Sequence, residues 1–213
     1  MPAVMLKTLA KPAYARYTDR GSRFYAYAYP IMDQSDINSW RSEIAEKYSD
    51  ATHHCYAWRY DPLNPQEFAQ DDGEPAGTAG LPILGVIKSE SLVNVLIIVV
   101  RYFGGTKLGK PGLIQAYREA ATLAVSHVEK MKIDRFIPFE IRYPYDQENR
   151  IRELISRYRM ETADEQYLEY VTITVFCKAN EAADLHGILE HLSYLDIAFR
   201  QHADCYRPVG YAG

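Results

Sequence analysis

A glycine-rich stretch with basic and aromatic residues is the first candidate for chemistry in this sequence. It runs from Arg101 to Gly112 and reads RYFGGTKLGKPG. Glycines let a chain turn tightly and approach a ligand closely, and Pro111 suits the first turn of a helix. Free amides at that helix N-terminus, with Lys107 and Lys110 beside them, predict a site for an anion such as phosphate or an RNA backbone.

Several residues of this stretch have two interpretations. Arg101 either makes a bidentate contact to phosphate or pairs with an acidic residue of the loop that begins at Asp71. Tyr102 and Phe103 either stack on bases or belong to the core. The stretch is not a G-x-x-x-x-G-K-[ST] phosphate loop, and a tight structural turn is the alternative to a binding site. The candidate residues for nucleic-acid or phosphate binding are Arg101, Tyr102, Phe103, Gly104, Gly105, Lys107 and Lys110.

Three carboxylates lie close together in the sequence at Asp71, Asp72 and Glu74. Oxygen ligands of this kind suit a hard divalent cation, but the spacing fits no calcium-binding loop, and we assign no metal site. The alternative is structural: the carboxylates stabilise the start of a following helix and pair with Arg101 or Lys107. Thr78 is the expected N-cap of that helix.

A third candidate group is His53-His54-Cys55. Neighbouring residues of a strand point to opposite faces, so the two histidines cannot chelate one ion together, and one of them shares a face with Cys55. A Cys–His nucleophilic pair is one interpretation. Because the sequence offers no evident oxyanion loop or orienting acid, a hydrogen-bonded structural role is favoured. We assign no catalytic residue.

The elements that must position these residues follow from hydrophobic spacing and turn residues. A hairpin at 13–18 and 23–29 precedes a helix capped by Ser35, with Ile37, Trp40, Ile44 and Tyr48 on one face. We expect further strands at 53–60 and 92–103, a polar loop over 62–70, and helices at 79–90 and 111–130.

The last third of the chain predicts a second domain with the order βαββαβ, a ferredoxin-like arrangement. Its elements are expected at 136–144, 146–159, 160–167, 168–178, 180–193 and 195–205. We therefore predict a two-layer α+β protein with domains at 1–134 and 135–213.

Composition limits the classes of function. The chain has 213 residues and a net charge of −4, and residues 136–213 carry 8 Lys and Arg against 13 Asp and Glu. Nucleic-acid contacts, which need a basic surface, are therefore expected from a local patch in the first half. Three widely separated cysteines indicate free thiols in a reducing cytoplasm. The apolar run Leu92–Val100 is too short to span a membrane, and the first eleven residues lack the apolar stretch of a signal peptide.

The motifs together resemble the signature blocks of the YigZ/IMPACT family. The matching segments are Gly21-Ser22-Arg23-Phe24, HHCYA from His53, DDGEPAGTAG from Asp71, RYFGGTKLG from Arg101 and GLIQAY from Gly112. One departure is Lys110-Pro111, where the family more often has small residues and a further glycine.

The resemblance implies a first domain with the fold of ribosomal protein S5 domain 2 and a second, ferredoxin-like domain similar to one in translation elongation factor G. It also implies a translation-linked regulator that contacts RNA, the ribosome or a translation factor. The residues His53, His54, Cys55, Asp71, Asp72, Glu74 and Thr78 are then expected to belong to the signature site, with His54 at its rim.

Two other classes of function stay open from sequence. One is an enzyme for a phosphate-bearing substrate, with magnesium held by Asp71, Asp72 or Glu74 and His54 as base. The other is a protein-interaction module, including a homodimer through the second domain's sheet. A non-enzymatic role without a cofactor is favoured.

Overall fold

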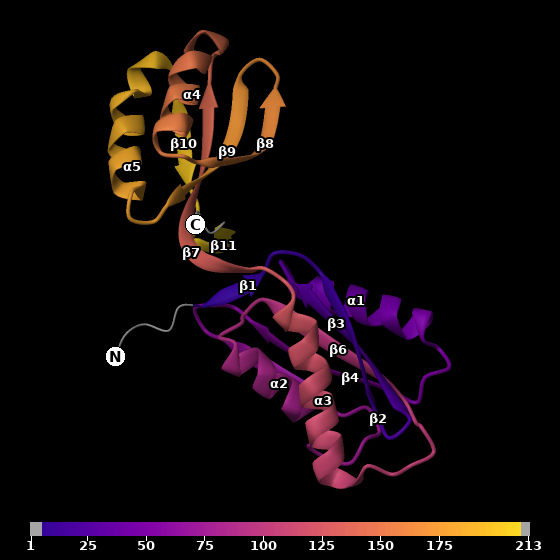
Figure 1. Ribbon diagram of the computed structural model, residues 1–213. Helices are drawn as coiled ribbons and strands as arrows, with labels where there is room; N and C mark the ends of the chain where they lie inside the picture. Colours follow the sequence, from indigo (N-terminus) through magenta and orange to yellow (C-terminus); the bar gives the residue numbers. More distant parts are fainter. Residues whose placement is uncertain (1–5, 210–213) are drawn as a thin grey trace. The chain divides into compact units, whose positions relative to one another are not determined.

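The computed structural model describes residues 6–209, which divide into two compact units (Figure 1). The described residues up to Ile133, with Pro208 and Val209, form the first unit, and Asp134–Arg207 form the second. The fold is mixed α and β with antiparallel sheets. None of the helices within the described residues is long and apolar enough to cross a membrane.

The first unit is built on a five-stranded sheet with the order β2-β3-β6-β4-β5. Its strands are β2 (Ala13–Asp19), β3 (Ser22–Pro30), β4 (His53–Tyr60), β5 (Gln66–Gln70) and β6 (Val95–Tyr102). Strand β6 is central, and Val95 to Val100 are buried. Burial on both faces explains why this segment is a continuous apolar run. A short strand, β1 (Lys7–Leu9), pairs with the first residues of β7.

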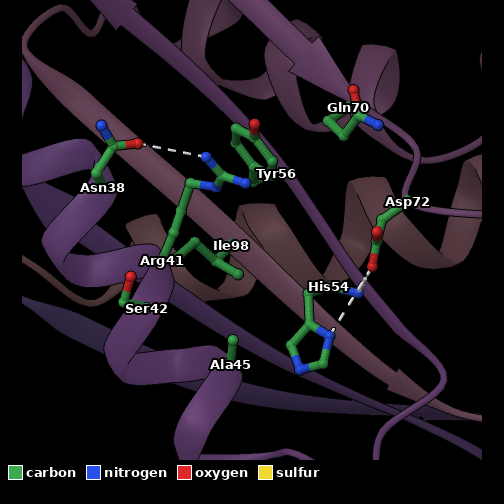
Figure 2. Close-up of a pocket in the computed structure, with 9 residues that line it drawn as sticks. All are labelled: Asn38, Arg41, Ser42, Ala45, His54, Tyr56, Gln70, Asp72 and Ile98. Carbon is green, nitrogen blue, oxygen red and sulfur yellow. Dashed lines mark hydrogen bonds and ion pairs between the residues drawn. The ribbon is translucent and has the colours of Figure 1, made fainter.

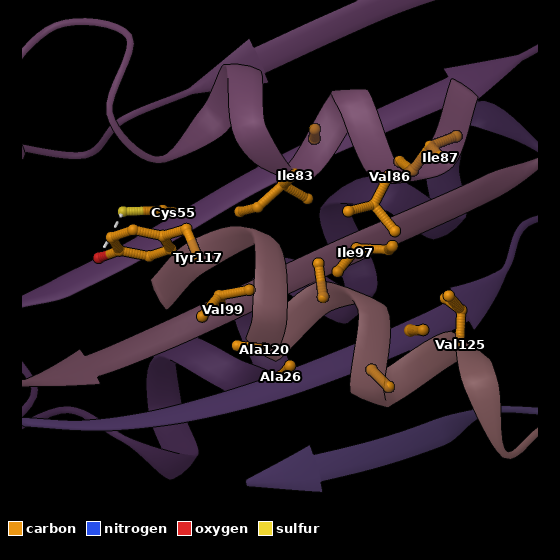
Figure 3. Packing of buried hydrophobic residues seen from close by; sticks show 14 of the residues in the cluster. Ala26, Cys55, Ile83, Val86, Ile87, Ile97, Val99, Tyr117, Ala120 and Val125 are labelled. Carbon is orange, nitrogen blue, oxygen red and sulfur yellow. Dashed lines mark hydrogen bonds between the residues drawn. The ribbon is translucent and has the colours of Figure 1, made fainter. Parts of the chain in front are cut away.

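Helices cover both faces of this sheet. Helices α2 (Gly80–Ser89) and α3 (Gly109–Ser126) pack on one face, where Ile83 and Val125 join Ile97 and Val99 in the core (Figure 3). Helix α1 (Gln34–Lys47) packs on the other face through residues that include Ile37 and Ile44.

The predicted N-caps of α1 and α2 were wrong. Asp33, not Ser35, caps α1: its carboxylate accepts the Ser35 amide at 2.8 Å, and the Asp36 carboxylate in turn accepts the Asp33 amide at 3.1 Å. At α2 the Thr78 hydroxyl donates to the Pro75 carbonyl instead, at 2.6 Å. The first amides of α2 donate to the Asp71 carboxylate. Each helix therefore uses an aspartate, whose charge also suits the positive end of the helix dipole.

The prediction of a polar loop over 62–70 is wrong for its second half. Residues Gln66–Gln70 form β5 and pair with β4, with Trp58 opposite Phe68 and Tyr56 opposite Gln70. Because β5 is an edge strand with mostly exposed side chains, it lacks the apolar alternation that reveals a half-buried strand.

The second unit has the predicted element order β-α-β-β-α-β. Its elements are β7 (Lys130–Tyr143), α4 (Glu148–Arg157), β8 (Glu161–Tyr167), β9 (Val171–Lys178), α5 (Ala182–His191) and β10 (Ala198–Gln201), with single 3-10 turns at Tyr145–Gln147 and Ser193–Leu195. The first residues of β7, up to Ile133, belong to the first unit. The strands lie in the order β10-β7-β9-β8, and β11 (Cys205–Val209) also pairs with β7. The alternating residues of β9, Val171, Ile173, Val175 and Cys177, all face the core.

Candidate functional site

A buried cluster of polar side chains lies at the end of β6 in the first unit. Glu74 Oε1 accepts a hydrogen bond from Arg101 Nη1 at 2.6 Å and another from the Tyr117 hydroxyl at 2.8 Å. The side chains of Arg101 and Glu74 are 7% and 3% exposed. Of the two interpretations of Arg101, the ion pair with the acidic loop is therefore the one observed.

Ser22 connects this cluster to the glycine-rich loop. Its buried hydroxyl accepts the Gly104 amide at 3.2 Å and the Arg101 Nη2 group at 3.4 Å. A Cβ on Gly104 would lie 1.9 Å from the carbonyl carbon of Gly21. Only glycine allows this approach, so the turn between β2 and β3 fixes where the loop begins.

The loop then opens onto a cavity of about 380 Å³ at the start of α3. It is lined by Glu74, Pro75, Arg101, Phe103, Lys107, Leu108, Gly109, Lys110 and Leu113. Phe103 is 53% exposed, and both lysines are exposed. No side chain caps the amides at the N-terminus of α3. The cavity thus combines free backbone donors, two cations and an aromatic ring, which is the chemistry of an anion site.

Among the described residues, Arg101 keeps one donor without a partner. Its Nε atom is buried and has no hydrogen-bond partner within residues 6–209. A buried donor left without a partner is costly, and this cost is part of what holding Arg101 in the cluster requires.

The Asp71 carboxylate accepts hydrogen bonds from the backbone at the start of α2. It accepts the amides of Gly77 at 2.8 Å and of Ala79 and Gly80 at 2.9 Å each. Burial acts to raise the pKa of Asp71, but the three amides outweigh it and lower the pKa below the ordinary value. This carboxylate therefore has the predicted helix-stabilising role.

The three acidic residues do not converge on one point. Glu74 faces Arg101, whereas Asp72 Oδ2 accepts the His54 amide at 2.6 Å. Within the described residues, no three histidine, cysteine or acidic side chains gather in a way that could hold a metal ion.

His53 and Cys55 belong to the buried cluster. His53 Nδ1 bonds the Asp72 carbonyl at 2.7 Å, and its Nε2 lies 3.9 Å from Glu74 Oε1. The Cys55 sulfur lies 2.9 Å from the Asp71 carbonyl oxygen. It also lies 3.3 Å from the Tyr117 hydroxyl (Figure 3), and its single S–H can donate to either oxygen. Burial raises the pKa of the fully enclosed Cys55 thiol. A neutral, inaccessible thiol is a structural group and a poor nucleophile.

His54 lies on the opposite side of the sheet from the buried cluster. With Asp72 and Arg41 it lines a second cavity of about 620 Å³ beside α1 (Figure 2). The structure therefore brings together Glu74, Arg101 and Lys107 as predicted, but the prediction that His54 lies at the rim of the same site was wrong. Tyr102 also packs with the α1 side, unlike its neighbour Phe103.

Sequence reasoning missed two residues that hold the cluster together, Ser22 and Tyr117. Both stand inside blocks of the family resemblance, in GSRF and GLIQAY. The residue type alone does not indicate a functional role for either, because a serine in a turn and a tyrosine in a helix are common.

Comparisons with known proteins agree with these motifs. The model of the Impact N-terminal domain matches residues 20–125. IMPACT family member YvyE of Bacillus subtilis is 36% identical over 107 residues, which is 50% of this chain and 49% of that protein, so the match spans about half of that relative.

Two further matches extend over more of the chain. IMPACT family member YigZ of Escherichia coli K12 is 30% identical over 152 residues, 70% of this chain and 74% of that protein. A solved structure, described as the crystal structure of a hypothetical protein, matches with a TM-score of 0.68 and 25% identity; the match covers 91% of this chain and 95% of that one. The chain therefore belongs to the YigZ/IMPACT family.

Proposed function

We propose that this protein is a cytoplasmic, translation-linked regulator that binds RNA through the glycine-rich loop. The observation that carries the proposal is the cavity at the start of α3, where Lys107, Lys110 and the exposed ring of Phe103 surround uncapped amides. Lysines and amides would hold the phosphates, and the ring would stack on a base.

The role proposed for Arg101 differs from that of the lysines. Its Nη1 group is committed to Glu74 and its Nη2 group to Ser22, so it positions the loop. Its Nε atom is enclosed by the protein. The lysines, which have no ion-pair partner within residues 6–209, supply the charge.

The finer fold assignment supports the translation link. We propose that the first unit is ribosomal protein S5 domain 2-like and that the second, with its strand order β10-β7-β9-β8, is ferredoxin-like and akin to a domain of elongation factor G. Contact with the ribosome or a translation factor is part of this proposal.

Replacing both loop lysines tests the proposal. Lys107→Ala with Lys110→Ala should weaken binding to single-stranded RNA, because two phosphates would no longer be neutralised. The slope of log affinity against log salt should fall by roughly 0.7 for each of these phosphates. Fluorescence anisotropy of a labelled oligonucleotide at several salt concentrations measures both quantities.

Lys11→Ala is a matched control. This exposed lysine precedes β2, whose other end carries Asp19 opposite Ser22, so the strand's length separates Lys11 from the loop. Unchanged affinity and slope in the lysine pair would sink the proposal. If a nucleotide instead raised the melting temperature, and only with magnesium, a phosphate-substrate enzyme would replace it.

A further inference from the structure

A second surface of the first unit combines aromatic rings with cations. It lies on the face of the sheet that α1 covers, over β2, β3 and the end of β6. We call it the tyrosine face, and its residues are Tyr14, Arg16, Arg23, Tyr25, Lys47, Tyr48 and Tyr102. Tyr14 is 52% exposed, and all three cations are exposed.

Sheet register explains why rings and cations alternate on this face. Arg16 stands directly opposite Tyr25, and Arg23 directly opposite Tyr102. Residues directly opposite each other on neighbouring strands share a face and touch. The guanidinium of Arg16 accordingly lies 5.7 Å from the Tyr25 ring centre, and that of Arg23 lies 5.1 Å from the Tyr102 ring centre.

Helix α1 adds the third cation. Lys47 Nζ lies 5.0 Å from the ring centre of Tyr27 and 5.6 Å from that of Tyr48. Tyr48 in turn stacks on Tyr25 with ring centres 5.5 Å apart. The rings are thus held by packing before any ligand arrives, which reduces the entropy lost on binding.

The charges of this face are not neutralised by the protein. Arg16, Arg23 and Lys47 have no carboxylate within ion-pair distance among residues 6–209, whereas Arg59 and Lys88 share Glu67. A carboxylate does reach the edge of the face at Asp50, but it accepts the Tyr102 hydroxyl and pairs with none of the three cations. The three cations lie against tyrosine rings and keep N–H donors for a ligand. This combination suits a polyanion that also carries planar rings.

We propose that the tyrosine face binds single-stranded RNA by stacking bases on its tyrosines while Arg16, Arg23 and Lys47 hold the phosphates. The inference rests on the proposed function and extends it from the loop to a separate surface. Tyr14 of β2, Tyr25 of β3 and Tyr102 of β6 each place one ring on this face, and aromatic rings stack with the unpaired bases of a single strand. A duplex hides its bases and could not use the rings.

The tyrosine face leads directly to the glycine-rich loop along the chain. The Arg23–Tyr102 pair ends the strands, Phe103 follows, and Gly104 donates its amide to Ser22 beside Arg23. A strand of RNA lying across β2 and β3 would therefore reach the loop lysines at the same end of the sheet.

Two variants separate charge from stacking on the tyrosine face. Arg16→Gln with Arg23→Gln should weaken binding of a uridine oligonucleotide and lower the salt slope by roughly 0.7 for each phosphate left without its cation. Tyr14→Ala should weaken binding by about five- to 160-fold, the contribution of one stacked base, with no change in slope. Arg150→Gln with Arg200→Gln, two exposed arginines of the second unit, is the matched control and should leave both quantities unchanged.

Crosslinking of a 5-iodouridine oligonucleotide to the full chain, mapped by mass spectrometry, decides between the two surfaces. Crosslinks to Tyr14 or Tyr25 are expected. Crosslinks to Phe103 alone would overturn the inference and leave the loop proposal standing. Crosslinks to the tyrosine face, together with an RNA affinity that Lys107→Ala and Lys110→Ala leave unchanged, would support the inference and overturn the loop proposal. Equal competition by duplex RNA, or no binding at all, would overturn the inference.

Discussion

At the scale of single residues, the Glu74 carboxylate is the centre of the first unit's polar chemistry. It accepts hydrogen bonds from Arg101 and Tyr117 in a nearly closed environment. A buried ion pair gains little over a well-packed apolar pair, but removing one partner leaves an uncompensated charge. The pair therefore ties the DDGEP loop to β6 and α3.

Glu74→Gln should lower the free energy of unfolding by about 3 to 5 kcal/mol, because the charge of Arg101 would stay buried without a counter-charge. Urea denaturation measures the decrease. Glu67→Gln is the control: Glu67 pairs with Arg59 and Lys88 but its side chain is 27% exposed, and such pairs contribute about 0 to 1 kcal/mol. Equal decreases in both variants would contradict the role assigned to burial.

At the scale of elements, one carboxylate decides where α2 begins. The Asp71 side chain gathers the amides of Gly77, Ala79 and Gly80 and so satisfies donors that the helix itself cannot. The same residue contributes its carbonyl to Cys55 of β4, which joins the helix start to the sheet.

Asp71→Asn should destabilise the protein by about 0.5 to 2 kcal/mol at neutral pH, the usual range for removal of a cap. The pKa of Asp71 is lowered by folding, so its stabilisation is complete above the unfolded value of about 3.9 and is lost as pH falls through the folded value. The difference between wild type and variant should therefore shrink as pH falls below about 4. Denaturation curves from pH 7 to pH 3 measure it, and a constant difference would rule out the charge as the cause.

At the scale of the whole molecule, the chain has separate cores. Ile173 and Leu185 belong to the core of the second unit, and Ile97 and Tyr117 to that of the first. On the outer face of the second unit's sheet, Glu140, Arg142, Thr172 and Thr174 alternate with buried residues. Pro138 and Phe176 lie on the same outer face, and a homodimer through this sheet stays a prediction.

Ile173→Ala should destabilise the second unit by about 2 to 5 kcal/mol, because it leaves a cavity in a closed core. Hydrogen exchange should accelerate in β8 and β9 and stay unchanged in β6, since β6 packs in another core. Uniform acceleration across both units would show that they unfold as one.

The sequence predicted the core elements and failed where exposed groups decide the structure. The alternation of Val171, Ile173 and Val175 predicted β9, and the continuous apolar residues of β6 predicted that strand. Burial imposes such patterns on a sequence. Strand β5 was missed because an edge strand with exposed side chains has no such pattern. The cap of α2 was misassigned because Asp71 reaches an amide nine residues away, beyond any local capping rule.

The sequence by itself determined the family, the order of the elements and the segments that carry the site, since these follow from local composition and from the order of the motifs. Only the tertiary structure decided which partner each polar group takes. Arg101 faces Glu74, His54 lies apart from Lys107, and Tyr14 and Tyr25 share one face with Arg16 and Arg23. Such pairings depend on strand register and on which face a residue occupies, and a shift of one residue in register would reverse the faces.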